Sequence, residues 1–196
     1  FAGLIGLDDD GILTPLTATQ ILWINLLTDT GPALALGVDP VDRRLMLLPP
    51  RAVDARVIDA AMRRGILLIG CTMAAVTLLM LDLKLPGGLI EGDADIDEAR
   101  SAAFTVLVLA QLFNCFSARS DVVSARRGWR ANHLLLWAVA FAFALQLLVV
   151  HAPPLNDAFA TTPLSIGDWV LSVVLASAVL WVSEARKWVR RRGGAE

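Results

Sequence analysis

Five blocks of mostly apolar residues, each close to or above the length that crosses a membrane, restrict what this chain can fold into. A helix needs about 20 such residues to span the hydrocarbon core of a bilayer. Hydrophobic residues make up 56% of the 196, and charged residues make up 18%, whereas a typical soluble domain is about 25% charged. We therefore predict an all-α, multi-span transmembrane helical bundle. The composition does not favour a nucleic-acid-binding domain.

The apolar blocks also place the individual spans. The chain opens with an apolar run, 1–7, that is too short to cross a bilayer. We interpret this run as the end of a helix that begins before residue 1. The expected bundle therefore has the end of one helix plus five full spans, over 17–37, 65–83, 101–118, 133–152 and 166–185.

Charge in the connections predicts which side of the membrane each one occupies. The connections carrying most of the basic residues alternate with acidic ones, where only Lys84 and Arg100 are basic. Because an excess of Lys and Arg marks the cytoplasmic side, the C-terminus is expected in the cytoplasm. The other 15 of the 17 basic residues follow the first, third and fifth spans: Arg43, Arg44, Arg51, Arg56, Arg63, Arg64, Arg119, Arg126, Arg127, Arg130, Arg186, Lys187, Arg190, Arg191 and Arg192.

The acidic connection 86–100 has two interpretations. Asp93, Asp95 and Asp97 alternate there, as carboxylates do at the start of a calcium-binding loop. However, the glycine and the distal glutamate of an EF-hand loop are absent. We therefore interpret this segment as a solvated extracytoplasmic loop.

Polar residues within the first span suggest an ion site. Asp29 lies near the middle of this span, where a carboxylate costs about 2.5–3.5 kcal/mol on insertion scales. Such residues usually face a bundle interior or a water-filled path. Asn25 lies one turn before Asp29 on the same face, and Thr28 lies beside them. Together they offer the oxygen ligands that a hard cation prefers. Gly31-Pro32 follows, which predicts a broken helix with exposed backbone carbonyls.

Two further spans carry amide side chains. Gln111 and Asn114 are three residues apart on one face of the third span, where they could coordinate an ion or form interhelical hydrogen bonds. These alternatives stay open on chemistry alone. Gln146 has no polar companion on its own face of the fourth span, so we assign it to packing.

The pattern of these residues resembles a known family. Leu22-Trp-Ile-Asn-Leu-Leu-Thr-Asp29, followed by Gly31-Pro32-Ala-Leu-Ala-Leu-Gly37, resembles the sixth transmembrane helix of P-type calcium ATPases. Asp39-Pro40 and Leu48-Pro-Pro-Arg51 resemble the cytoplasmic loop that follows it, and Val108-Leu-Ala-Gln-Leu-Phe-Asn-Cys115 resembles the eighth helix. The resemblance covers residues 1–196, as a C-terminal transmembrane domain running from the end of helix five to helix ten.

The resemblance implies a set of ion ligands. The asparagine, threonine and aspartate that coordinate the ion in helix six fall on Asn25, Thr28 and Asp29. The helix-eight glutamate of sarcoplasmic reticulum-type pumps falls on Gln111, where plasma-membrane and secretory-pathway calcium pumps resemble this chain in having glutamine. The implied cargo is Ca²⁺, with Mn²⁺ as the alternative because it accepts similar oxygen ligands.

The resemblance further implies half of an ATP-driven pump that exports a divalent cation across the plasma membrane. These 196 residues hold no D-K-T-G-T phosphorylation motif, no T-G-E-S actuator loop and no nucleotide domain. ATP and Mg²⁺ would therefore act through missing domains, and this chain alone is expected not to hydrolyse ATP. Its partners would be the lipid bilayer and the pump's N-terminal half, with no nucleic acid. The alternatives are a non-enzymatic membrane subunit or assembly factor, and a secondary transporter fragment, although the N-x-x-T-D-x-G-P segment occurs once.

Overall fold

The computed structural model describes residues 7–8, 11–12, 16–39, 58–87, 92–118 and 132–192. For residues 7–8, 11–12 and 28–29 it describes the backbone only. Nearly all of these residues are helical, which confirms the prediction of an all-α membrane bundle. Two short strands, β1 (Leu7–Asp8) and β2 (Gly11–Ile12), pair antiparallel near the start. The helices are α2 (Ala18–Gly37), α3 (Ala60–Lys84), α4 (Ile96–Ala118), α5 (His133–His151), α6 (Pro153–Phe159) and α7 (Ile166–Arg192).

Each predicted span coincides with one of the long helices, with changed ends. Among the described residues, α3, α4, α5 and α7 are long and apolar enough to cross a membrane. The helix α2 is 20 residues long but less apolar, because its sequence includes Gln20, Asn25 and Asp29. Residues 1–6 of the expected helix end lie outside the described residues, and Leu7 belongs to β1 rather than to a helix.

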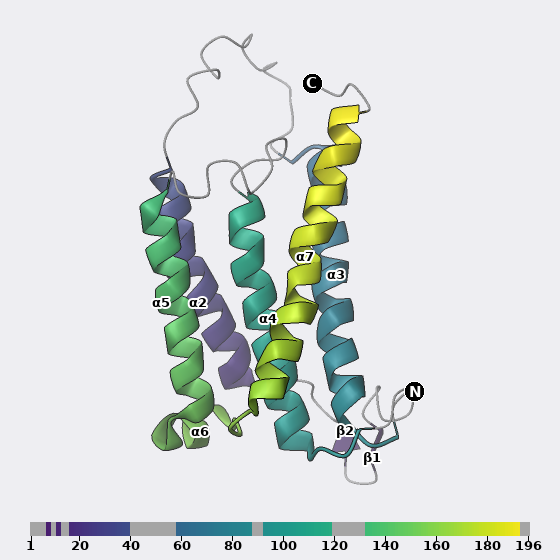
Figure 1. Cartoon of the computed structure of the whole chain (residues 1–196), viewed down its shortest axis with the longest axis vertical. Coiled ribbons are helices and arrows are strands. Elements are labelled where there is room, and N and C mark those ends of the chain that lie inside the picture. Colours follow the sequence, from purple (N-terminus) through teal and green to yellow (C-terminus); the bar gives the residue numbers. More distant parts are fainter. Residues whose placement is uncertain are drawn as a thin grey trace.

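The helix α4 occupies the centre of the bundle and packs against α2, α3, α5 and α7 (Figure 1). Its buried positions include many small residues, which allow neighbouring helix backbones to approach closely. The largest side chain in this buried set is Phe104, which contributes to a core shared with Ile24 and Leu27 of α2 and Val179 of α7. The small buried residues of α4 are Ala99, Ser101, Ala102, Ala103, Ala110 and Ser117.

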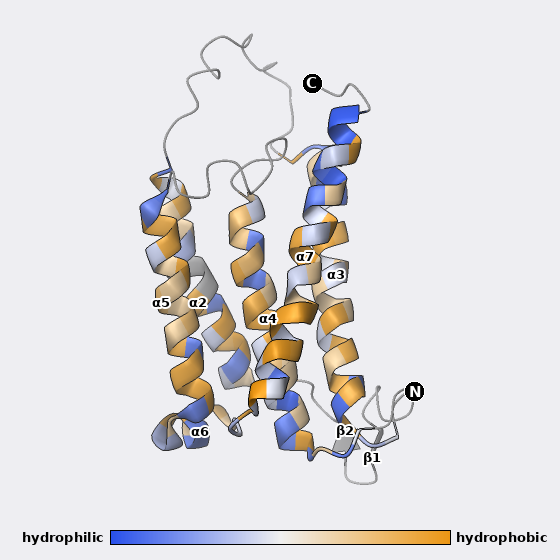
Figure 2. Ribbon diagram, in the orientation of Figure 1, coloured by the Kyte–Doolittle hydropathy of each residue, from blue (hydrophilic) through white to orange (hydrophobic). Residues whose placement is uncertain are grey.

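Charge and hydropathy distinguish the two ends of the bundle (Figure 2). One end, which we call the basic end, carries the start of α3 and the last turns of α7 with Arg190, Arg191 and Arg192. The other, which we call the α6 end, carries the short helix α6 and the β1–β2 hairpin (Figure 1). Apolar residues predominate on the long helices between these ends, as expected for membrane-spanning segments.

The acidic connection is partly helical, which corrects one prediction. The helix α4 begins at Ile96, so Asp97 and Glu98 form its first turn instead of a solvated loop. Carboxylates in the first turn of a helix are stabilised by the unpaired N–H groups and the helix dipole. Glu98 also pairs with Lys84 of α3 at 2.8 Å, and Arg100 pairs with Asp97 at 2.8 Å. Residues 88–91 lie outside the described residues.

Candidate cation site

The helix α2 carries three of the four predicted ligands and runs without a break through Gly31-Pro32. The predicted unwinding is therefore wrong. Pro32 cannot donate the hydrogen bond that the carbonyl of residue 28 would otherwise receive, but a proline need only kink a helix that its neighbours support. The helix α5 lies against α2 here, because a Cβ added at Gly31 would make an ordinary van der Waals contact of 3.7 Å with Cβ of Ala138.

The face of α2 that carries the predicted ligands points away from the described bundle. Ile24 and Leu27 are 4% and 7% exposed and pack into the core with α4, whereas Asn25 is exposed. Asp29 is four residues after Asn25, so its Cβ lies on the same face, but its side chain and that of Thr28 are not described. An amide facing hydrocarbon is costly, so this face requires a protein or water-filled neighbour.

The fourth predicted ligand lies on α4. Gln111 is half-buried, and among the described residues no hydrogen bond joins it to Asn25. Asn114, on the same face of α4, lines a pocket of about 590 Å³ between α3, α4 and α7 that also includes Gly65 and Arg186. Among the described side chains, no group of three or more His, Cys, Asp or Glu residues could hold a metal ion. Among the described side chains, Asn25 and Gln111 each offer one amide oxygen, fewer than the about six to eight oxygen ligands that Ca²⁺ takes.

A buried polar bridge fixes the opposite face of α2. Nε1 of Trp23 donates to Oε1 of Gln146 on α5 at 3.1 Å. Nε2 of Gln146 in turn donates to Oγ1 of Thr105 on α4 at 3.4 Å. Gln146 and Thr105 are both fully buried. The assignment of Gln146 to packing overlooked these partners because they come from other helices, and its one sequence signal is an amide in the middle of an apolar span.

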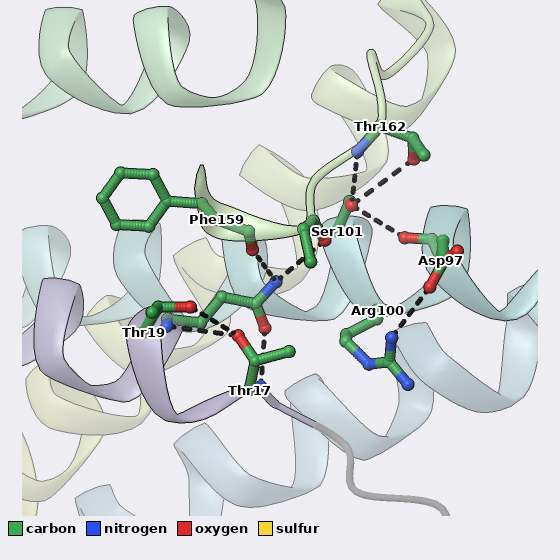
Figure 3. Close-up of polar contacts among 9 residues, drawn as sticks. Thr17, Thr19, Asp97, Arg100, Ser101, Phe159 and Thr162 are labelled. Carbon is green, nitrogen blue, oxygen red and sulfur yellow. Dashed lines mark hydrogen bonds and ion pairs between the residues drawn. The ribbon is translucent and has the colours of Figure 1, made fainter. Parts of the chain in front are cut away.

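Hydrogen bonds to the end of α6 and to the connection after it fix the start of α2 (Figure 3). Thr17 caps the helix, with the side chains of Thr17 and Gln20 each accepting from the other's backbone N–H. Nε2 of the fully buried Gln20 donates to the backbone carbonyls of Phe159 and Ala160 at 3.1 and 3.4 Å. The same connection bonds to α4, where the N–H of Thr162 donates to the Ser101 hydroxyl at 2.9 Å.

Asn132 holds the other end of α2, at the basic end. Its Nδ2 donates to the carbonyl of Ala35 at 2.8 Å and to Oδ1 of Asp39 at 2.7 Å. The Ala35 carbonyl belongs to the last turn of α2, where carbonyls lack intrahelical donors. Oδ1 of Asn132 also accepts from the N–H of Leu135 and so caps α5. The helix α2 is thus held at both ends and at Trp23, about one turn after Gln20, while among the described side chains Asn25 on the opposite face is exposed.

A comparison with protein families identifies the relationship of this chain. Residues 13–189 match the family described as cation transporting ATPase, C-terminus. The chain belongs to this family. The match covers α2 to α6 completely and α7 to within its last turn. The resemblance seen in Leu22–Asp29 is therefore confirmed at the level of the family.

The relatives of this cation-transporting ATPase domain include two named calcium-transporting ATPases and one named probable cation-transporting ATPase. The chain is 35% identical over 185 residues to calcium-transporting ATPase 1 of Schizosaccharomyces pombe, covering 94% of this chain and 20% of that protein. It is 36% identical over 174 residues to calcium-transporting ATPase type 2C member 2 of Rattus norvegicus, covering 88% and 18%. A probable cation-transporting ATPase F of Mycobacterium tuberculosis is 32% identical over 170 residues, with 86% and 18% covered. The chain thus spans about a fifth of the length of these relatives.

Proposed function

We propose that this chain is the C-terminal membrane part of an ATP-driven pump that exports a divalent cation, foremost Ca²⁺, from the cytoplasm. The observation that carries the proposal is the uncovered Asn25 face of α2, because an amide at membrane depth needs a polar neighbour that the described bundle does not supply. In a protein as long as these relatives, the other four fifths of the sequence would supply that polar neighbour.

The proposed cation path follows from this placement. Asn25, Thr28 and Asp29 of α2 would offer an amide oxygen, a hydroxyl and a carboxylate, and Gln111 of α4 would offer a second amide oxygen. We propose that this chain corresponds to the region from the end of helix five to helix ten, so that a further set of ligands would come from earlier helices of the pump. ATP binding, Mg²⁺ binding and phosphorylation would take place in domains outside these residues.

The dependence of phosphoenzyme formation on added Ca²⁺ or Mn²⁺ tests this function. In membranes containing the full-length pump, Ca²⁺ should stimulate formation of an acid-stable phosphoenzyme from ATP, because ion binding in the membrane licenses phosphoryl transfer. Mn²⁺ should substitute at a comparable or lower affinity, since it accepts similar ligands. Phosphorylation that is indifferent to both ions would contradict the proposal and favour a non-enzymatic membrane subunit. Family membership already disfavours the secondary-transporter alternative.

We also propose that the basic end faces the cytoplasm and that the pump resides in the plasma membrane. Arg63 and Arg64 of α3 and Arg190, Arg191 and Arg192 of α7 all lie at this end. Reporter domains fused at Arg192 should therefore score as cytoplasmic, and those inserted at Asn156 of α6 as extracytoplasmic. The opposite result at either position would reverse or break the alternating arrangement of spans.

A further inference from the structure

The bridge from Trp23 through Gln146 to Thr105 lies inside the membrane part of the bundle and joins three helices. None of its three residues is a proposed ligand. Trp23 and Asn25 are two residues apart on α2. At about 100° per residue their side chains leave α2 on nearly opposite faces. A contact that fixes the Trp23 face therefore also fixes the direction in which the Asn25 face points.

From this geometry we infer that Gln146 of α5 is a positioning residue that holds α2 in the rotation at which its Asn25–Asp29 face meets the cation. The inference rests on the proposed function. Among the described side chains, no hydrogen bond joins Gln146 to Asn25 or Gln111. It acts through Trp23, to which it is bonded at 3.1 Å, and it is steadied by Thr105 at 3.4 Å.

Burial explains why this bridge is specific. Gln146 and Thr105 are fully buried, and no water competes for their hydrogen bonds in a membrane interior. If α2 turned about its axis, the indole N–H would lose its acceptor and the Gln146 carbonyl oxygen would lose its donor. Leaving such groups unsatisfied away from water is costly. Apolar contacts alone are less directional, since Ile24 and Leu27 could repack against α4 after a small rotation.

The anchors at the two ends of α2 do not make this bridge redundant. Gln20 and Asn132 bind near the two ends of the helix, through the backbone carbonyls of Phe159, Ala160 and Ala35. Gln20 also binds through its side chain, but it lies five residues before Asn25, whereas Trp23 lies two residues before it, so among the described anchors the bridge is the nearest to Asn25. Trp23 also packs edge-to-face on Phe159, with ring centroids 5.0 Å apart, so its ring has a defined orientation.

Replacing Gln146 by Met in the full-length pump tests the inference, because methionine is similar in size but offers Trp23 only a weak sulfur acceptor in place of the amide oxygen. The Ca²⁺ concentration for half-maximal phosphorylation should rise about three- to tenfold, which corresponds to losing an interhelical hydrogen bond. The maximal phosphoenzyme level should change less than the half-saturating concentration. Trp23→Phe should give a similar shift, and the double variant should add little to either single change, since both remove one bond.

Matched controls separate positioning from a general loss of stability. Leu145→Met makes a comparable change on the adjacent, partly buried position of α5, and Trp137→Phe removes an indole from an exposed position of the same helix. Both should leave the half-saturating concentration unchanged. In protein labelled with 5-fluorotryptophan, the Trp23 resonance, assigned by its loss in Trp23→Phe, should move in Gln146→Met and stay in place in Leu145→Met.

The outcomes are separable from those of the proposed function. A wild-type pump that shows no ion-dependent phosphorylation defeats the function itself. Normal ion dependence in the wild type, with an unchanged half-saturating concentration in both Gln146→Met and Trp23→Phe, overturns the positioning role alone. Additive shifts in the double variant would also overturn it. If Gln146→Met does not accumulate, Trp23→Phe, which keeps an aromatic ring on Phe159, decides the question by the same measurements.

Discussion

Replacing Asp29 by Asn in the full-length pump is expected to abolish Ca²⁺-dependent phosphorylation by ATP, while the amount of protein in the membrane stays near normal. Asp29 is the acidic residue nearest the middle of α2, so it would supply the formal charge that this part of the pump offers to a divalent ion. An apolar residue would insert more cheaply at this depth, so packing alone does not account for a carboxylate. We expect the half-saturating Ca²⁺ concentration to rise by more than about a hundredfold.

Graded variants make this expectation sharper. Asn25→Ala should weaken ion dependence less than Asp29→Asn, because it removes an uncharged oxygen from the same face. Gln111→Ala should do least, since a single amide oxygen can be replaced by water. Asp157→Asn makes the same chemical change on an exposed residue of α6 and should have no effect. Loss of Asp29→Asn from the membrane, instead of loss of ion dependence, would assign Asp29 a structural role.

The second large effect is expected at the α6 end of the bundle, where Lys84 joins three helices. Its Nζ pairs with Asp168 of α7 at 2.5 Å and with Glu98 of α4 at 2.8 Å. The side chains of Lys84 and Asp168 are only 17% and 11% exposed. Lys84→Met would leave the Asp168 carboxylate largely buried without its cation, and removing one partner of a buried pair costs about 3–5 kcal/mol. Partial exposure reduces this to about 2 kcal/mol.

The rate of thermal inactivation of the full-length pump measures this effect. We expect Lys84→Met to shorten the half-life at a fixed temperature by roughly fivefold or more. Glu98→Gln should cost less, because Glu98 is 38% exposed and Lys84 keeps Asp168. The double variant Lys84→Met with Asp168→Leu should recover much of the loss, since the buried Asp168 carboxylate is gone and Glu98, which also loses Lys84, is partly exposed to solvent. Equal half-lives for Lys84→Met and the wild type would show that the pair contributes nothing to stability.

The spans could be predicted from the sequence because the length and apolarity of a block carry most of the information about a membrane helix. Their ends were predicted less well, because polar residues can continue a helix beyond the hydrocarbon. The helix α7 extends through Lys187, whose amine donates to the carbonyl of Ser117 at the end of α4 at 3.0 Å. From the sequence alone, a lysine in a basic tail is expected to be solvated, because the position of the neighbouring helix end is not known. Similarly, α6 begins with Pro153 and Pro154, which suit a first turn but also resemble a loop.

The candidate site could be predicted only along α2, where spacing alone places Asn25 and Asp29 on one face. Spacing could not show that this face is the uncovered one, because that depends on how Ile24 and Leu27 pack against α4. The Trp23–Gln146 bridge joins residues 123 positions apart. A single sequence has no pattern that pairs such distant residues. The predicted break at Gly31-Pro32 failed for a related reason, since α5 supports the helix at Ala138.

Equilibrium binding of radioactive Ca²⁺ to the purified full-length pump, without ATP, tests whether the Asn25–Asp29 face of α2 binds the transported ion. Binding in this assay would depend on the proposed membrane ligands and not on phosphorylation by ATP. If Asp29 is a ligand, we expect saturable high-affinity binding to the wild type, unchanged binding to Asp157→Asn, and loss of at least one bound ion per pump in Asp29→Asn. Equal affinity and equal stoichiometry in the wild type and Asp29→Asn would contradict it.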